Sequence, residues 1–252
     1  MSPFDLSGKN ALVTGGNKGL GFAITRGLAQ AGANVVIASR TLSDLEHALP
    51  RILEGTASHG ECIAFDASDR SSVARLGAEA LRRMGRIDIL VNNAGMNAPQ
   101  AIDAIDDDTW DRVLEVNLSA VMALTRAVVP SMKTQRWGRI IHVSSIFGLV
   151  SKERRNAYSA TKSALLGLAR ASAIDLGPFG ITVNCLSPGP FLTDMPKSVL
   201  NDAERAAFAD HTCLNRWADP VELVGPCLLL ASNAGSYITG TALVVDGGYT
   251  AR

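Results

Sequence analysis

A tyrosine and a lysine stand four positions apart in the run from Tyr158 to Lys162, and Ser145 lies thirteen residues upstream. On a helix, positions i and i+4 share one face, so we expect the phenol of Tyr158 and the ammonium of Lys162 to lie side by side. A nearby cation stabilises a phenolate, which predicts a tyrosine pKa below its ordinary value of about 10. Such a phenol suits proton transfer, and the Ser145 hydroxyl is expected to hold the same substrate oxygen.

A glycine-rich segment from Thr14 to Gly21 follows a strand-like run directly and precedes a helical pattern. This order of strand, turn and helix is the context that a dinucleotide site requires. We expect Gly15 to permit a tight turn, Gly19 to let the backbone approach a pyrophosphate, and Gly21 to permit close packing. The helix N-terminus offers unpaired N–H groups to phosphates. The spacing G-x-x-x-G-x-G matches the general fingerprint only loosely, so an ordinary glycine-rich turn is the alternative.

The end of the second strand-like run discriminates between the two nicotinamide cofactors. An acid there would bind the adenosine ribose and repel a 2′-phosphate, whereas an arginine accommodates that phosphate. This chain carries Ser39 and Arg40 there and no acid, and Lys18 in the glycine-rich loop adds a second cation. The sequence therefore favours NADP (NADPH) over NAD, the alternative being two solvated surface charges.

Seven apolar runs alternate with helical patterns and would position these residues. The predicted strands are Asn10–Thr14, Asn34–Ala38, Glu61–Phe65, Ile87–Asn92, Arg139–Ser144, Ile181–Leu186 and Ala242–Asp246. Near-continuous apolar strands separated by helices predict an α/β fold, a doubly wound parallel sheet of about seven strands with helices on both faces. We expect a single Rossmann domain over residues 1–252, with a polar substrate-loop insertion at 190–217.

Composition narrows the classes of function. The 252 residues are 47% hydrophobic and carry a formal net charge of zero, which gives no general field for nucleic acid or an anionic membrane. No run of about 18 apolar residues predicts a membrane span, and the first nine residues lack the apolar stretch of a signal peptide. The four cysteines form no C-x-x-C pair and no zinc-like cluster, so we expect free thiols, no metal and a cytoplasmic location.

With further short motifs, the chain resembles the short-chain dehydrogenase/reductase family over essentially its whole length. The motifs are TGxxxGxG at Thr14–Gly21, NNAG at Asn92–Gly95, and the PGxxxT segment from Pro188 to Thr193. Pro190 departs from the usual pattern and removes one N–H near the cofactor. Phe191 takes a position whose backbone often holds the carboxamide, and its ring is expected to wall the substrate pocket. The resemblance implies cofactor contacts at Gly15, Asn17, Lys18, Gly19, Leu20, Gly21, Ser39, Arg40, Asp66, Ala67, Asn93, Ala94, Gly95, Tyr158, Lys162, Pro188, Gly189, Phe191 and Thr193.

The resemblance also implies a mechanism and an assembly. Hydride would pass from NADPH to a carbonyl carbon, Tyr158 would give the proton, and Ser145 would hydrogen-bond the oxygen. Lys162 would lower the Tyr158 pKa and bind the nicotinamide ribose, while Asn117 would organise a water relay to Lys162. A homotetramer is the expected assembly, and a small-molecule carbonyl or alcohol the expected partner.

The substrate is less determined. Arg154 and Arg155 precede Tyr158 and are candidates to bind a carboxylate or phosphate, since arginine binds such groups bidentately. A solvated loop or a packing role in a tetramer is the alternative. Finer resemblances point to gluconate 5-dehydrogenase-type members, which act on sugar acids and polyols, or to 3-oxoacyl-carrier-protein reductases. A dinucleotide-binding protein without catalysis is a third alternative, although such a protein would usually lack Ser145, Tyr158 or Lys162.

Overall fold

A parallel seven-stranded sheet forms the centre of the computed structural model, which describes residues 2–193 and 201–252. The strand order is β3-β2-β1-β4-β5-β6-β7. The strands are β1 Asn10–Thr14, β2 Asn34–Ser39, β3 Gly60–Ala64, β4 Ile89–Asn92, β5 Gly138–Val143, β6 Ile181–Pro188 and β7 Ala242–Val245. The predicted fold class is confirmed, and the predicted strands match to within two residues at each end.

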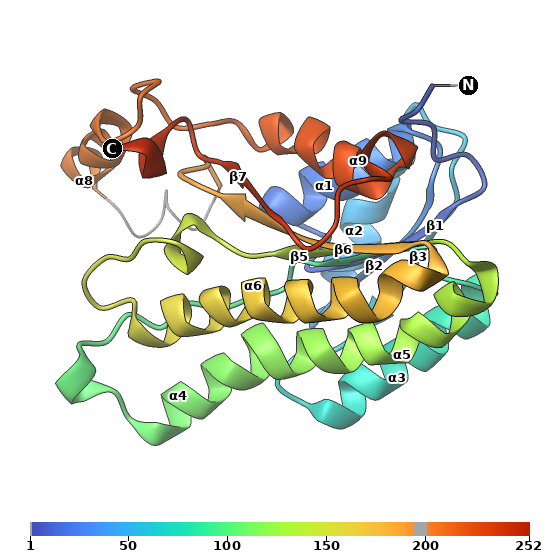
Figure 1. Cartoon of the computed structure of the whole chain (residues 1–252), viewed down its shortest axis with the longest axis horizontal. Helices are drawn as coiled ribbons and strands as arrows, with labels where there is room; N and C mark the ends of the chain where they lie inside the picture. Colours follow the sequence, from blue (N-terminus) through green and yellow to red (C-terminus); the bar gives the residue numbers. More distant parts are fainter. Residues whose placement is uncertain (1, 194–200) are drawn as a thin grey trace.

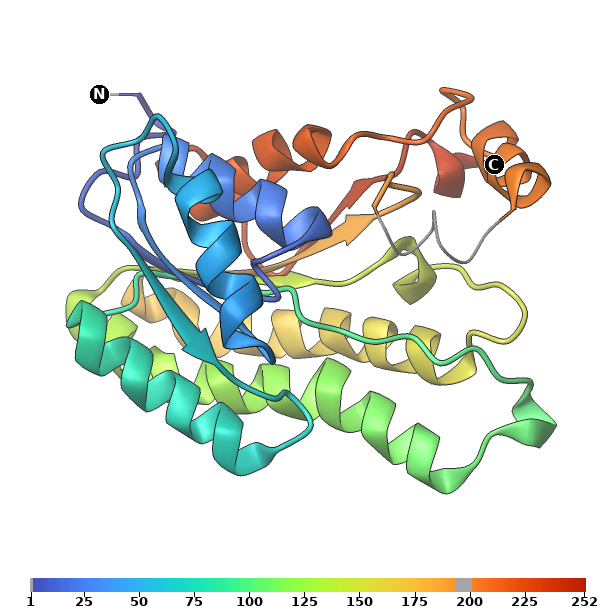
Figure 2. The same ribbon diagram turned by 180° about the vertical axis from the view of Figure 1, so that it is seen from behind.

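Helices cover both faces of the sheet, as Figures 1 and 2 show from opposite sides. One face carries α1 Gly19–Gln30, α2 Leu42–Leu53 and α9 Val224–Ala231. The other carries α3 Arg70–Met84, α4 Asp107–Leu114, α5 Ala120–Gln135 and α6 Asn156–Leu176. The short helices are η1 Ile102–Ala104, η2 Glu115–Ser119, η3 Ile146–Gly148, η4 Gly177–Phe179, η5 Pro220–Leu223, η6 Asn233–Gly235 and η7 Tyr249–Ala251. The inner strands β1, β4, β5 and β6 are therefore buried on both sides, which explains their apolar composition, whereas the edge strands β3 and β7 are only partly buried.

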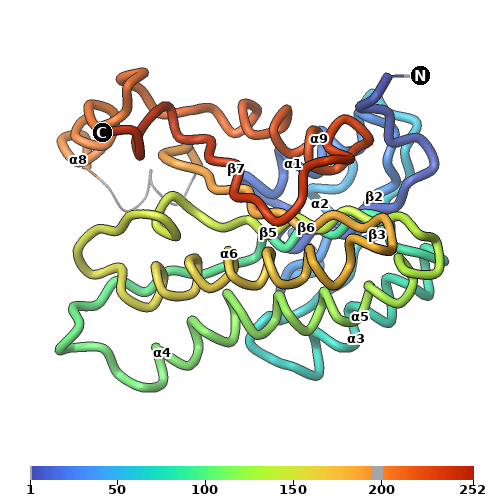
Figure 3. The backbone as a smooth tube through the Cα atoms, in the orientation of Figure 1, coloured from blue at the N-terminus to red at the C-terminus, as the bar shows by residue number. Residues whose placement is uncertain are grey.

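The helical run Asp107–Gln135 combines α4, the π-helical turn η2 and α5, and the tube in Figure 3 follows it along one face of the molecule. By length and composition alone this run would be able to cross a membrane. In the fold, α5 packs on α3 and α4 packs on α6, with Val121, Leu124 and Val128 in the core. Core helices of globular proteins meet the same two criteria, so the run carries no evidence for a membrane.

The strand order reverses between β1 and β4, and open α/β sheets bind ligands outside the carboxyl ends of the strands at such a point. The ends of the predicted insertion 190–217 lie at this edge. Ala218 N donates to Pro190 O, and Leu192 N donates to Ala218 O, so the chain leaves and rejoins the edge at one place. Helix α8, Asp202–Asp210, lies beyond it beside the C-terminus (Figures 1 and 2). The residues at 194–200 are outside the described part of the chain.

Candidate active site

Ser145, Tyr158 and Lys162 meet at the carboxyl end of β5. Ser145 follows this strand and starts η3, where its Oγ accepts a hydrogen bond from Phe147 N at 3.1 Å. Tyr158 and Lys162 lie one turn apart near the start of α6, which packs along β6 and η3. The Ser145 hydroxyl acts on the Tyr158 phenol and lowers its pKa. The predicted i, i+4 pairing is present, with Lys162 Nζ 5.5 Å from the centroid of the Tyr158 ring.

The predicted lowering of the Tyr158 pKa is wrong for the ligand-free protein. Removal of the phenol from water raises its pKa above the ordinary value of 10, and this effect outweighs the Ser145 hydroxyl and the Arg155 charge, which both lower the pKa. Lys162 fails to reverse the shift because its ammonium lies over the ring and donates to Val143 O at 2.7 Å. Spacing along the helix gave the neighbourhood of the two groups but not the direction of the ammonium.

Lys162 is itself perturbed. Its side chain is 4% exposed, and burial lowers its pKa from 10.5 to about 8. A β-carbon added at Gly95 would lie 3.5 Å from Lys162 Nζ and 3.3 Å from Asn117 Oδ1. The ammonium and the amide therefore converge on the exposed backbone at Gly95, where a bound ligand would meet both.

Asn117 sits in the π-helical turn η2 between α4 and α5. Its Oδ1 accepts from Met96 N at 2.8 Å, and its Nδ2 donates to Met96 O at 2.9 Å and to Thr161 Oγ1 at 3.2 Å. Single π-turns inside α-helices are frequent at functional sites because they redirect one side chain. Here the turn ties the loop after β4 to α6, a link that sequence inspection missed because no residue type marks a π-turn.

The glycine-rich loop has the geometry that its sequence predicts. Gly15 has φ +64° and Gly19 has φ +54°, values in the left-handed region that favours glycine. A β-carbon at Gly21 would stand 2.1 Å from Gly15 O, so α1 approaches the loop too closely for any side chain there. Asn17, Lys18 and Leu20 complete the turn and the start of α1.

The NNAG segment, Asn92–Gly95, stabilises the glycine-rich loop through hydrogen bonds. Thr14 Oγ1 accepts hydrogen bonds from Asn93 N and Ala94 N, both at 3.0 Å. Asn93 Nδ2 returns bonds to Thr14 O at 2.9 Å and Gly15 O at 3.2 Å. Thr14 thus has a supporting role that the sequence analysis did not assign, although it opens the TGxxxGxG motif.

Three features fit a dinucleotide along this edge. No side chain caps the N-terminus of α1, which leaves its first N–H groups available to a phosphate. Ser39 Oγ is buried and has no hydrogen-bond partner in the described part of the chain, as expected of a group that binds an adenosine moiety. Arg40 is exposed next to it, and its charge helps to lower the pKa of Asp66, after the hydrogen bonds from Ser68. Ala67 follows Asp66 beyond β3.

The end of β6 closes the other side of the edge. Pro188 is the last residue of the strand, and a β-carbon at Gly189 would lie 2.6 Å from Asp246 Cβ. Thr193 approaches the glycine-rich loop, since its Cγ2 would be 3.4 Å from a β-carbon at Gly19. The Phe191 ring is 4% exposed and belongs to the core under α1 and α9, so the expectation that it walls the substrate pocket is wrong. Packing in this core removes the apolar surface of the ring from water, which a position at the open edge of the sheet would not do.

Arg154 and Arg155 lie on the loop before α6 and differ in their surroundings. Arg154 is exposed, has φ +63° and donates from Nη2 to Pro99 O at 3.4 Å. Arg155 is half-buried, and its Nε and Nη1 have no hydrogen-bond partner among the described residues. Over residues 2–193 and 201–252, no group of three or more His, Cys, Asp or Glu side chains is arranged to hold a metal ion.

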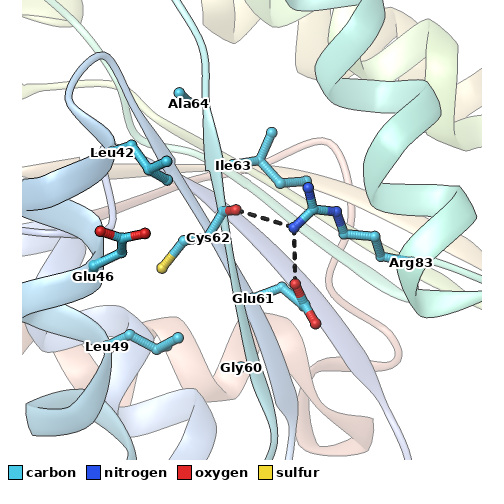
Figure 4. Close-up of a pocket in the computed structure, with 9 residues that line it drawn as sticks. All are labelled: Leu42, Glu46, Leu49, Gly60, Glu61, Cys62, Ile63, Ala64 and Arg83. Carbon is cyan, nitrogen blue, oxygen red and sulfur yellow. Dashed lines mark hydrogen bonds and ion pairs between the residues drawn. The ribbon is translucent and has the colours of Figure 1, made fainter.

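Figure 4 shows a separate pocket at the outer edge of the sheet, lined by α2, β3 and Arg83 of α3. Arg83 Nη1 donates to Glu61 Oε2 at 2.9 Å and to Cys62 O at 3.3 Å. None of the predicted site residues lines this pocket. A charged side chain bound to an edge-strand carbonyl protects the edge from pairing with another chain, and we assign the pocket no catalytic role.

Comparisons with known proteins agree with this geometry. A family model described as enoyl-(acyl carrier protein) reductase matches residues 15–250. Gluconate 5-dehydrogenase of Gluconobacter oxydans is 35% identical over 98% of this chain and 96% of its own length. The 3-oxoacyl-(acyl-carrier-protein) reductase of Vibrio harveyi is also 35% identical, over 97% of this chain and 98% of its own. The crystal structure of a gluconate 5-dehydrogenase from Burkholderia cenocepacia, in complex with NADP and tartrate, superposes with a TM-score of 0.93 at 34% identity, covering 99% of this chain and 98% of that one.

Proposed function

The chain belongs to the short-chain dehydrogenase/reductase family of oxidoreductases, and we propose that it interconverts a ketone and a secondary alcohol with NADP(H). We propose further that the substrate is a sugar acid or a related polyol, as the name of the Gluconobacter relative suggests. The observation that carries the proposal is the grouping of Ser145, Tyr158 and the buried Lys162 at the carboxyl end of β5, with Lys162 Nζ 5.5 Å from the centroid of the Tyr158 ring.

The residues divide the work on the substrate oxygen. Tyr158, protonated near neutral pH because of its raised pKa, donates its proton to the carbonyl oxygen as negative charge develops there. Ser145 Oγ already accepts from Phe147 N, which leaves its own proton to be donated, and we assign this donation to the substrate oxygen. Bound NADPH supplies the hydride.

Lys162 and Asn117 support this proton transfer. The Lys162 ammonium adds positive charge beneath the phenol, and Asn117 fixes the loop at Met96 and the helix at Thr161 around it. We propose that these two residues keep open a path along which a proton moves between Tyr158 and solvent. Gly95, where both groups converge, is the place at which a nicotinamide ribose would contact them.

The adenosine end is proposed to select NADP. Arg40→Asp is expected to lower kcat/KM for NADPH by about 10- to 100-fold and to leave or improve that for NADH. The reason is that a carboxylate repels a 2′-phosphate and accepts from ribose hydroxyls, an exchange of interactions of roughly 1–3 kcal/mol. Steady-state kinetics with both cofactors measures the ratio.

Arg75→Asp on α3 is the matched control, since Arg75 is also exposed but pairs with Asp69 at the start of α3 and does not follow β2. An unchanged NADPH/NADH ratio in Arg40→Asp would mean that Arg40 is only a solvated surface charge.

A second substrate class has a specific observation in its favour, because the Vibrio reductase is as similar to this chain as the Gluconobacter dehydrogenase. NADPH oxidation with 5-keto-D-gluconate and with an acetoacetyl thioester, at equal concentrations, decides between them. Preference for the keto acid is the expected result. Preference for the thioester would make the 3-oxoacyl-carrier-protein reductase the better assignment.

A non-catalytic dinucleotide-binding role is the remaining alternative, and turnover of either compound would exclude it.

We also propose a cytoplasmic homotetramer. Its support is the apolar surface left on the outer helices, where Ile174 of α6 is 79% exposed and Met122 of α5 is 41% exposed. Sedimentation equilibrium that gives the mass of one chain would contradict the tetramer.

A further inference from the structure

Two segments that flank the catalytic tyrosine run side by side. Gln100, in the loop after β4, forms an isolated parallel bridge with Arg155, just before α6. Gln100 N donates to Arg154 O at 3.0 Å, and Asn156 Nδ2 donates to Gln100 O at 3.1 Å. These bonds hold Gln100 and Arg155 together, one helical turn before Tyr158.

The backbone separates the two neighbouring arginines. Arg154 takes a left-handed conformation, φ +63°, and its side chain runs over the surface to Pro99 O. Arg155 adopts φ −104° as the residue that precedes α6, and its guanidinium turns inward. The Arg155 charge is felt at the Tyr158 hydroxyl, whose pKa it lowers against the larger effect of burial. Of the two arginines, Arg155 is therefore the one whose charge acts on the reacting group.

Arg155 carries hydrogen-bond donors that the described residues leave unused. Its Nε and Nη1 are closed off from solvent, and neither has a partner in residues 2–193 or 201–252. Buried polar groups are nearly always paired, and unpaired guanidinium donors are among the most costly exceptions. A guanidinium presents its N–H groups in a planar fork that matches a carboxylate.

Gln100, which is bridged to Arg155, offers a hydrogen-bond acceptor where Arg155 offers donors. Its Nε2 donates to Asp106 Oδ2 at 2.9 Å, and Asp106 is itself fixed as the N-cap of α4, where Oδ1 accepts from Thr109 N at 2.8 Å. This bond sets which end of the amide is the oxygen. Gln100 Oε1 is thus a buried acceptor without a donor among the described residues. An acceptor of this kind needs an O–H or N–H group from a ligand.

We propose that Arg155 binds the carboxylate of a hydroxylated acid substrate, that Gln100 Oε1 accepts a hydrogen bond from one of its hydroxyls, and that Arg154 takes no part. A hydroxy acid supplies both an anionic acceptor and O–H donors, whereas the acyl chain of a thioester supplies neither. The assignment rests on the proposed function, because it places the substrate by its contact with Tyr158.

Calorimetric titration of the NADPH-saturated protein tests this assignment without turnover, because D-gluconate is the alcohol form of the substrate and cannot accept a hydride. The ligands are D-gluconate, D-glucitol, which has a hydroxymethyl group in place of the carboxylate, and D-glucitol 6-phosphate. We expect D-gluconate to bind at least tenfold more tightly than the other two. Arg155→Gln is expected to weaken D-gluconate at least tenfold, and Arg155→Lys to weaken it less because the charge remains.

Arg154→Gln is the matched control, with the same loss of charge one residue away, and should bind D-gluconate within twofold of the wild type. Both variants should keep the NADPH affinity of the wild type, and Arg155→Gln should unfold at no lower temperature because it removes buried donors that lack a partner. Equal losses in the two variants, or no binding of D-gluconate by the wild type, would overturn the assignment. Tighter binding of the phosphate, lost in Arg155→Gln, would overturn the carboxylate. Should D-gluconate bind through Arg155 while 5-keto-D-gluconate is never reduced, the inference stands and the proposed reaction fails.

Discussion

Tyr158→Phe is expected to lower kcat by about two to four orders of magnitude and to leave the dissociation constant of NADPH within about twofold. A positioned general acid contributes roughly 10²–10⁴-fold, and the phenylalanine removes the only donated proton while keeping the ring. The ring is what the surrounding structure uses for packing, since it meets Phe147 edge to face at 6.5 Å between centroids. Stopped-flow or steady-state NADPH oxidation gives kcat, and quenching of protein fluorescence gives the binding constant.

Tyr237→Phe is the matched control, because Tyr237 is fully exposed and remote from the site. Its variant should have the wild-type kcat. A protein that only senses or binds the dinucleotide would behave alike in both variants, and near-normal turnover in Tyr158→Phe would remove Tyr158 from the mechanism.

Rate against pH tests the raised pKa of Tyr158. Ketone reduction needs the protonated phenol, which is present throughout the neutral range when the pKa lies above 10. Alcohol oxidation needs the phenolate, so its rate should still be rising above pH 9. This asymmetry is absent if a cation lowers the pKa toward neutrality, as the spacing of Tyr158 and Lys162 by itself suggests.

The fold was predictable because its signals are local. Strands buried on both faces read as continuous apolar runs, such as Val35 to Ala38, and a glycine whose β-carbon would strike a backbone oxygen has no substitute, as at Gly21. The same local signals also predicted which residues belong to the site. Parallel strands end at one edge, so residues that follow β1, β5 and β6 must meet there.

The predictions that failed depend on the direction in which a side chain points in the folded protein, which its position in the sequence does not determine. The i, i+4 spacing does not reveal that Lys162 Nζ turns to Val143 O, and this turn leaves desolvation to set the Tyr158 pKa. The choice between Arg154 and Arg155 depends on one backbone angle, which an arginine does not signal. Phe191 was expected to wall the pocket because the sequence does not show that its side chain packs in the core beneath α1.

Lys162→Met is expected to reduce kcat by at least about 100-fold and yet to stabilise the ligand-free protein near pH 7. Loss of the ammonium removes the charge that supports the developing phenolate, which accounts for the kinetic effect. The stability effect follows from burial, which lowers the lysine pKa from 10.5 to about 8. Keeping that charge buried costs about 3 kcal/mol at neutral pH, since one pKa unit corresponds to about 1.4 kcal/mol. The Val143 carbonyl loses its donor in the variant, at about 1 kcal/mol, so a net gain of about 2 kcal/mol is expected.

The pH dependence gives this prediction its sign. Between pH 8 and about 10.5 the unfolded wild-type chain binds more protons at Lys162 than the folded chain does, so wild-type stability rises with pH across this window relative to the variant. The advantage of Lys162→Met should therefore be largest below pH 8 and disappear near pH 10.5, as measured by urea unfolding at pH 7, 8.5 and 10. His142 and Cys185 feel the Lys162 charge, but their pKa values of about 4 and about 12 lie outside this window. A pH-independent difference would mean that Lys162 is not destabilising as a buried cation, whereas the predicted trend would show that the protein gives up stability in order to keep a charge beneath Tyr158.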